Sequence, residues 1–105
     1  MAVDIKDSGR IEKQLKALAD PTRRCIIELL KRKGCCSCEE VGASHSGLCV
    51  CDVESELKLT QPTITHHIRV LREAGLICTR KIGRWVYCCR DEKALDGLSD
   101  WLRRL

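Results

Sequence analysis

Residues 59–77 read L-T-Q-P-T-I-T-H-H-I-R-V-L-R-E-A-G-L-I, and this stretch decides the fold. Thr60 is a suitable N-cap, Pro62 is tolerated in a first helical turn, and Gly75 is a typical stop signal. Between these signals, three apolar residues recur at positions i, i+4 and i+7: Ile64, Ile68 and Leu71. This spacing predicts an amphipathic helix with one face in the core and a polar face outside.

A second helical segment directly precedes this one. Residues 49–59 read C-V-C-D-V-E-S-E-L-K-L and place three apolar side chains on one helical face: Val50, Val53 and Leu57. Two helices joined by so short a turn predict a helix-turn-helix. The second helix of such a pair enters the major groove of DNA.

Two strand-like segments follow, at residues 76–81 and 85–89, and they flank a turn at residues 82–84. This pattern predicts a β-hairpin. Three cations lie near its tip: Arg80, Lys81 and Arg84. A helix-turn-helix followed by a basic hairpin is a winged helix. We therefore predict a mainly α-helical protein with a β-hairpin wing, built as a single domain over residues 1–105.

The other segments are assigned from apolar spacing, caps and stop signals. They are a frayed start at residues 1–9, a short amphipathic helix at 10–19, a helix from the Asp20-Pro21 cap to a stop signal at Gly34, a loop at 35–48 and a last helix at 91–105.

The composition excludes several classes of protein. The net charge is +4 and aromatic residues are scarce, so a stacking platform for single-stranded nucleic acid is not expected. The N-terminus has no secretory signal and no apolar run is long enough for a membrane span, so we expect a cytoplasmic protein without membrane contact. Nine cysteines in a compartment that keeps thiols reduced indicate metal ligands, redox thiols or small core residues.

The polar face of the helix near residues 60–69 carries short polar and cationic side chains that suit double-stranded DNA. Gln and Thr can bond base edges, Arg can bind guanine or phosphate, and cations on a wing add salt-dependent affinity. His67 lies beside Ile64 and Ile68 and is expected to pack or hydrogen-bond at the helix edge instead. The alternative is an ordinary solvated face. The expected DNA contacts are Thr60, Gln61, Thr63, Thr65, His66, Arg69, Lys81 and Arg84.

Four segments carry a family resemblance: A-L-A-D-P-T-R-R at 17–24, C-V-C-D-V at 49–53, the stretch 59–77 and R-K-I-G-R-W-V-Y at 80–87. Over about residues 11–90 the chain resembles the ArsR/SmtB family of metalloregulatory repressors, in its arsenic-responsive branch. The resemblance implies a winged-helix homodimer that binds an inverted-repeat operator in its apo form and leaves it when inducer binds. The family's dimer interface is formed by the terminal helices, which here would use Leu95, Leu98, Trp101 and Leu102.

The motif C-V-C-D at residues 49–52 resembles the thiolate motif of the arsenite-responsive and cadmium/lead-responsive branches. The arsenic pattern has a further cysteine three residues after the second, where this chain has Glu54. The cadmium/lead pattern adds cysteines from the N-terminal arm, and residues 1–10 contain none. The segment just ahead of the motif looks like an insertion relative to the family and offers replacements: Cys35, Cys36 and Cys38.

These three cysteines, together with Cys49 and Cys51, are the candidate ligands of a soft ion. As(III) or Sb(III) would take three sulfurs and is the expected inducer. Cd(II), Pb(II) or Zn(II) would take three or four, and Hg(II) is a further candidate. The zinc-type site of this family uses Asp and His on the last helix, and residues 91–105 contain no His, so we predict no such site.

The spacing of the C-V-C motif suggests how binding could act on DNA. Residues i and i+2 of a regular helix point to nearly opposite sides, so Cys49 and Cys51 can share an ion only where the first turn is unwound or extended. Thiolate binding is therefore expected to distort the start of this helix and to move the recognition helix attached to it. A helix N-terminus is also expected to lower the pKa of these thiols.

The other cysteines have simpler interpretations. Cys25 lies on an apolar helix face and Cys78 in a strand, and both are expected to be small core residues. Cys88 and Cys89 are neighbours in a strand and point to opposite faces, so one should be buried and the other exposed, with a ligand role as the alternative. His45 is expected to be solvated.

Three other functions stay open at this point. The first is a repressor switched by a disulfide or polysulfide bridge, in which metal binding is incidental. The second is a permanent structural zinc site held by the cysteines of residues 35–51. The third is a small C-x-C oxidoreductase, which is disfavoured because the sequence has no βαβ pattern, no Gly-rich cofactor loop and no acid–base constellation. We therefore do not expect an enzyme.

Overall fold

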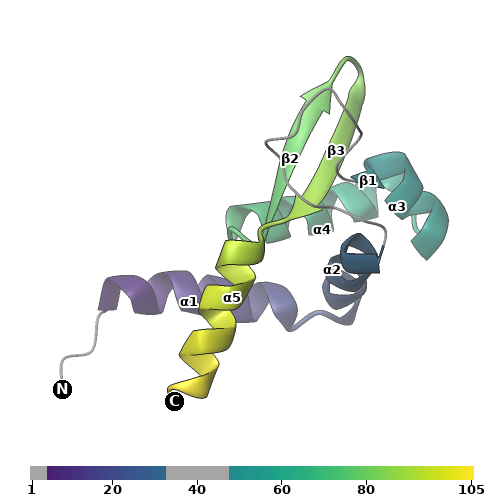
Figure 1. Cartoon of the computed structure of the whole chain (residues 1–105). Helices are drawn as coiled ribbons and strands as arrows, with labels where there is room; N and C mark the ends of the chain where they lie inside the picture. The colour runs from purple at the N-terminus through teal and green to yellow at the C-terminus, as the bar shows by residue number, and fades with distance from the viewer. Residues whose placement is uncertain (1–4, 33–47) are drawn as a thin grey trace.

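The computed structural model describes residues 5–32 and 48–105 of the chain (Figure 1). The helices in this part are α1 (Ile5–Leu18), α2 (Pro21–Arg32), α3 (Val50–Leu57), α4 (Gln61–Glu73) and α5 (Glu92–Arg103). The strands are β1 (Leu48–Cys49), β2 (Ile77–Ile82) and β3 (Trp85–Arg90). Within these two ranges, no helix is both long and apolar enough to cross a bilayer.

The predicted helix-turn-helix is present as α3 and α4. Lys58 closes α3 in the left-handed region at φ 55°, and its N–H donates to the carbonyl of Glu54 at 2.9 Å. Thr60 occupies the N-cap of α4, as expected, but its hydroxyl contacts the Thr63 hydroxyl at 3.0 Å and caps no backbone N–H. The turn therefore has the predicted position, while the predicted side-chain cap is wrong because the two hydroxyls pair with each other.

The predicted wing is also present, with a two-residue turn in place of the expected three. The strands β2 and β3 are antiparallel and end at the pair Ile82 and Trp85, around Gly83 at φ 62°. That left-handed backbone is accessible to glycine at little steric cost. A third strand, β1, pairs with β3 through Cys49 and Tyr87, so the sheet order is β1-β3-β2. Two residues are too short a pattern to predict a strand.

The core lies where α2, α3, α4 and the inner face of the sheet meet. Four of the side chains that the apolar spacing predicts are almost fully buried: Val53, Ile64, Ile68 and Leu71. The other two, Val50 and Leu57 of α3, are partly buried and pack against this cluster. Ile26 and Leu30 of α2 pack into the same cluster, as does Cys88 of β3. This packing fixes the outer face of α4 relative to the wing, because both elements share one core.

The first helix of the chain begins earlier than predicted. α1 starts at Ile5, and residues 5–9, which were expected to be frayed, are helical. The cause is that helix formation is cooperative, so a stable turn extends into polar neighbours that contain no proline. The predicted cap of α2 is confirmed, since the Asp20 carboxylate accepts from the N–H of Thr22 at 2.7 Å and of Arg23 at 3.2 Å.

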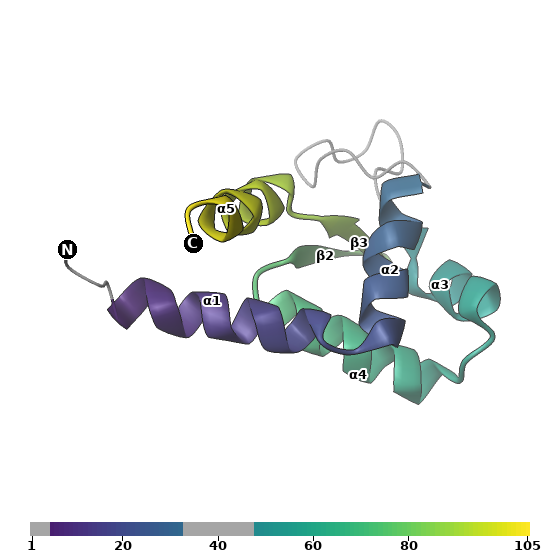
Figure 2. The same cartoon turned by 90° about the horizontal axis from the view of Figure 1, so that it is seen from below.

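The terminal helices lie at the end of the molecule opposite α3 (Figure 2). Leu98 of α5 is buried in the core of its own chain at 4% exposure, so it is not available to a partner as the resemblance implied. Leu15 of α1 and Leu102 of α5 remain 40% and 49% exposed. The first turn of α5 is fixed by Asp91, whose carboxylate accepts from the N–H of Ala94 at 3.0 Å.

Candidate metal and nucleic-acid site

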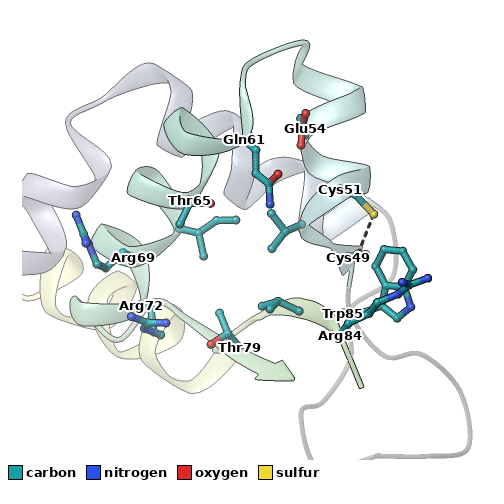
Figure 3. Close-up of a pocket in the computed structure, with 13 residues that line it drawn as sticks. Cys49, Cys51, Glu54, Gln61, Thr65, Arg69, Arg72, Thr79, Arg84 and Trp85 are labelled. Carbon is teal, nitrogen blue, oxygen red and sulfur yellow. Dashed lines mark hydrogen bonds between the residues drawn. The ribbon is translucent and has the colours of Figure 1, made fainter. Parts of the chain in front are cut away.

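The thiols of Cys49 and Cys51 meet at the start of α3. Cys49 ends β1 and is the N-cap of α3, with an extended backbone at φ −63° and ψ 143°. Cys51 lies in the first helical turn, and its Sγ is 2.9 Å from the Sγ of Cys49 (Figure 3). The extended residue is what lets the two sulfurs converge, because two helical residues at this spacing would point apart.

The thiol pair lines a cavity of about 420 Å³ between the helix-turn-helix and the wing (Figure 3). Glu54 borders it from α3, and Trp85 borders it from the wing. The cavity also contains four of the side chains predicted to contact DNA: Gln61, Thr65, Arg69 and Arg84. The sulfur atoms and part of the predicted DNA-reading surface therefore share one space.

All the side chains predicted to contact DNA are exposed. Six lie on the N-terminal part of α4 or its cap, and two lie at the tip of the wing: Thr60, Gln61, Thr63, Thr65, His66 and Arg69, then Lys81 and Arg84. The Arg84 guanidinium lies 5.2 Å from the centre of the Trp85 ring, in a cation–π arrangement. A helix with a short polar face beside a cationic hairpin is an arrangement that suits a duplex.

Comparisons with known proteins identify the family. Residues 44–79 match the family model described as bacterial regulatory protein, arsR family. Over 90 residues the chain is 34% identical to the HTH-type transcriptional regulator YbzH of Bacillus subtilis, covering 84% of this chain and 90% of that one. The chain belongs to the ArsR family. It is a transcriptional regulator and not an enzyme.

Two further relatives define how far the family likeness extends. Over 72 residues this ArsR-family chain is 42% identical to the arsenical resistance operon repressor of Escherichia coli, covering 69% of this chain and about half (51%) of that repressor. A solution structure from Mycobacterium bovis, described as a homodimeric winged helix-turn-helix DNA-binding domain, has a TM-score of 0.71 at 19% identity and covers 98% of this chain and 87% of that one. This likeness confirms the winged-helix fold.

The thiol pair of this ArsR-family chain differs from the sequence expectation in its acidity. The hydrogen bond with Cys49 raises the pKa of the Cys51 thiol, and burial and the nearby Asp52 carboxylate act in the same direction. The expectation that the helix N-terminus would lower this pKa is therefore wrong for Cys51. The physical reason is that a neighbouring sulfur, which can share the proton, outweighs the partial charge of an eight-residue helix.

The described residues contain two of the five predicted ligands. Cys35, Cys36 and Cys38 lie outside the described residues, as does His45. Within residues 5–32 and 48–105, no group of three His, Cys, Asp or Glu side chains is placed to hold a metal ion. Two soft sulfur donors in contact nevertheless fit a thiophilic ion, which prefers sulfur to oxygen ligands.

His67 takes the position that its spacing predicts, at the edge of α4. Its Nδ1 accepts a hydrogen bond from the Arg23 guanidinium at 3.2 Å, so the proton of the neutral ring is on Nε2. Burial lowers the pKa of His67, and Arg23 and His66 add to this effect, while the Asp20 carboxylate opposes it. His67 therefore links α4 to the start of α2, and its neighbour His66 faces solvent.

The remaining cysteines require two corrections. Cys25 was expected in the core and is exposed, because it lies at the edge of the apolar face of α2 that Ile26 and Leu30 bury. Of Cys88 and Cys89, one was expected to be exposed, yet they are 0% and 2% exposed. Cys88 packs into the hydrophobic core, while Cys89 points to the other face and lies against Cys78 of β2.

Sequence reasoning missed one pair of facing cysteines. Cys78 and Cys89 are directly opposite each other on β2 and β3, and their Sγ atoms lie 3.4 Å apart. The predicted three-residue turn would instead have placed Cys78 opposite Cys88. A shift of one residue in the register of a hairpin moves every side chain of a strand to the opposite face. The wrong turn length therefore led to the wrong partner for Cys78. The signal that could have found it is Gly83-Arg84 as a two-residue turn.

Proposed function

We propose that this ArsR-family regulator represses transcription as a homodimer on double-stranded operator DNA, and that As(III) or Sb(III) bound by Cys49 and Cys51 releases it. The observation that carries the proposal is the shared cavity, which is lined by both thiols and by DNA-facing side chains of α4 and the wing. A ligand at the thiols is thus in direct reach of the surface that it must disturb.

The backbone around Cys49 supplies the mechanical connection. Cys49 is the N-cap of α3, which leads through a short turn into α4, and it also pairs with Tyr87 of the wing strand β3. When both thiols release their protons and bind one ion, the 2.9 Å sulfur contact must open to fit the ion between the sulfurs. Any shift of this residue moves the start of α3 relative to the wing, and α4 moves with α3.

The third sulfur is proposed to come from Cys35, Cys36 or Cys38. These residues precede β1 in the sequence, and β1 ends at Cys49, so a short length of chain separates them from the thiol pair. Trivalent arsenic and antimony are soft acids that prefer sulfur ligands, and each would take the three sulfurs that we propose. Glu54, which occupies the family's usual third position, lines the same cavity and leaves room there for such a sulfur.

The dimer is proposed to form through α1 and α5. Apolar side chains remain exposed on both helices and just after α5: Leu15, Leu102 and Leu105. Exposed apolar side chains on the terminal helices favour a partner, and an isologous dimer places two recognition helices on one face. The Mycobacterium bovis domain of the same fold is described as homodimeric, which supports this arrangement.

The test is operator release under a non-thiol reductant, which prevents any disulfide switch. A fluorescent duplex, selected by the apo protein from a random library, reports binding by anisotropy. We expect arsenite to release the wild type, and the Cys49→Ser and Cys51→Ser variants to stay bound. Cys25→Ser is the matched control and should be released like the wild type, because Cys25 is exposed on α2 away from the cavity. Normal release of a Cys49/Cys51 double variant would refute the proposal.

A second set of variants separates the competing ligands and metals. Serine at Cys35, Cys36 or Cys38, one at a time, should weaken arsenite release at the position that supplies the third sulfur. The same titration with cadmium, lead, mercury or zinc salts identifies a regulator of divalent ions, if one of these releases the duplex and arsenite does not. Metal content of protein purified without added metal tests the permanent zinc site.

A further inference from the structure

We propose that Arg72 is a further DNA contact of this chain and binds a phosphodiester of the operator strand that passes between α4 and the wing. The inference rests on the DNA binding proposed above and adds a residue that the sequence analysis did not select. Its basis is the cavity between the helix-turn-helix and the wing, which Arg72 lines together with Arg69 of α4 and Arg84 of the wing (Figure 3).

The α4 wall of this cavity carries one continuous polar stripe. Gln61, Thr65, Arg69 and Arg72 follow each other at spacings of four, four and three residues, so they share one face of the helix. All four are exposed, and the first two are uncharged while the last two are cations. The N-terminal residues of a recognition helix contact base edges. The cations near its C-terminal end therefore lie where the helix leaves the groove and meets the phosphate backbone.

The cavity has an excess of positive charge. Three guanidinium groups line it, those of Arg69, Arg72 and Arg84, and Glu54 is the only acidic side chain among its described lining residues. In the part of the chain that the structure describes, the guanidinium groups of Arg69 and Arg72 have no salt-bridge or hydrogen-bond partner. Like charges that gather without acids to neutralise them favour an anion placed between them. The phosphate backbone of DNA is such an anion.

Arginines that stabilise the fold itself are paired in this structure. Arg23 donates to the Ala17 carbonyl at 2.7 Å, and the Arg90 Nε lies 2.9 Å from the Glu92 carboxylate. A structural role for Arg72 would instead come from its place in the last turn of α4, where a cation interacts favourably with the helix dipole. That role predicts a change in stability and no change in the phosphates that the protein contacts, so an experiment can separate the two.

The opposite wall of the cavity offers donors to the same DNA strand. Thr79 of β2 lines it, and threonine hydroxyls are common partners of phosphate oxygens. Arg84 borders it from the wing and would bind a neighbouring phosphate. A strand that is held from both walls depends on the spacing between α4 and the wing. Because Cys49 and Cys51 line the same cavity, a ligand at these thiols would lie beside that strand.

Uncharged backbone linkages test the proposal. One methylphosphonate linkage is placed at each position of the half-site in turn, in a duplex selected by the wild type, and arsenite is absent from every sample. We expect the wild type to bind more weakly at each linkage that it contacts. Arg72→Gln should lose this sensitivity at one linkage per half-site and keep it at the others, because the charge that read that phosphate is gone.

The salt dependence gives a second readout on the unmodified duplex. Removal of one phosphate contact per subunit of a dimer should make the slope of log affinity against log salt shallower by about 1.8, so the ratio of wild-type to variant affinity should fall about 12-fold over a fourfold rise in salt. Arg72→Lys keeps the charge and should keep the slope. Lys31→Gln is the matched control, because it removes an exposed cation near the C-terminal end of α2, and it should match the wild type at every linkage.

Three results would overturn the inference. The first is an Arg72→Gln protein with the slope and the linkage profile of the wild type. The second is a uniform loss of affinity in which no linkage becomes indifferent, as the structural role of Arg72 predicts. The third is a changed preference for base sequence with an unchanged linkage profile, which would make Arg72 a base contact. Failure of the wild type to bind any duplex would refute the proposed repressor itself, so the two failures are distinct.

Discussion

The wing arginine gives the sharpest test of how this regulator holds DNA. Arg84 is exposed at the turn of the hairpin, stacked over Trp85, and we expect it to neutralise one phosphate per subunit. In B-DNA each neutralised phosphate contributes about 0.9 to the slope of log affinity against log salt, so Arg84→Gln in a dimer should make the slope shallower by about 1.8. Over a fourfold rise in salt, from about 50 to 200 mM, the ratio of wild-type to variant affinity should then fall by about 12-fold.

Anisotropy titrations of one selected duplex over this salt range measure the slope directly. Lys31→Gln is the matched control, because it removes the same charge from an exposed residue at the C-terminal end of α2, which points away from α4 (Figure 2). Its slope should equal that of the wild type. If Arg84→Gln and Lys31→Gln gave the same slope, the wing would not contact phosphate and the interface derived for Arg84 would be refuted.

Three further predictions concern the scaffold behind the site. Leu71→Ala, which truncates a fully buried side chain of α4, should lower the free energy of unfolding by about 2–5 kcal/mol in urea titrations, and a loss below this range would mean that the core closes around the gap. Asp91→Ala removes the side-chain cap of α5 and should cost about 1 kcal/mol, with Asp91→Asn retaining most of it; equal losses in both variants would indicate a charge effect instead. The pKa of His67 is lowered from 6.5 in the folded protein, so the unfolded chain binds the proton first as pH falls. The free energy of unfolding should therefore decline as pH drops through about 6.5, and this loss should be complete below the folded pKa. The Asp20 carboxylate opposes this effect, and Arg23 and His66 reinforce it. His67→Gln should flatten this pH dependence of the unfolding midpoint, and an unchanged profile would assign it to other groups.

The parts of the fold that the sequence predicts are those with local start and stop signals. α4 has a proline in its first turn, a glycine after its end and an apolar residue at each inward position, so its bounds and its buried face follow from spacing alone. The cap of α2 at Asp20 is equally local. Such features depend on residues within one or two turns of each other, and tertiary contacts reinforce them without altering them.

The features that the sequence did not predict depend on pairing between distant segments. The strand β1 forms because Cys49 pairs with Tyr87, almost forty residues later in the sequence. A segment of two residues has no pattern from which this pairing could be predicted. The contact between Cys78 and Cys89 depends on the exact length of a turn, and a one-residue error there places the wrong face of β3 toward β2. The raised pKa of Cys51 likewise follows from a sulfur contact that the extended N-cap creates.

Residue 49 explains how the sensing that we propose can be joined to DNA binding in so small a protein. The backbone of a cysteine inside a regular helix pairs only within that helix, so a ligand on its side chain acts on that helix alone. Cys49 instead uses its backbone twice, as the start of α3 and as a partner of the wing strand, while its side chain meets Cys51. In our proposal, an ion that fixes this side chain acts directly on the wing and, through α3, on α4. The C-x-C spacing is therefore significant because its first residue is extended and its second is helical. A ligand that joins the two thiols can strain this junction. Two cysteines further apart within one helix would hold a ligand without straining it.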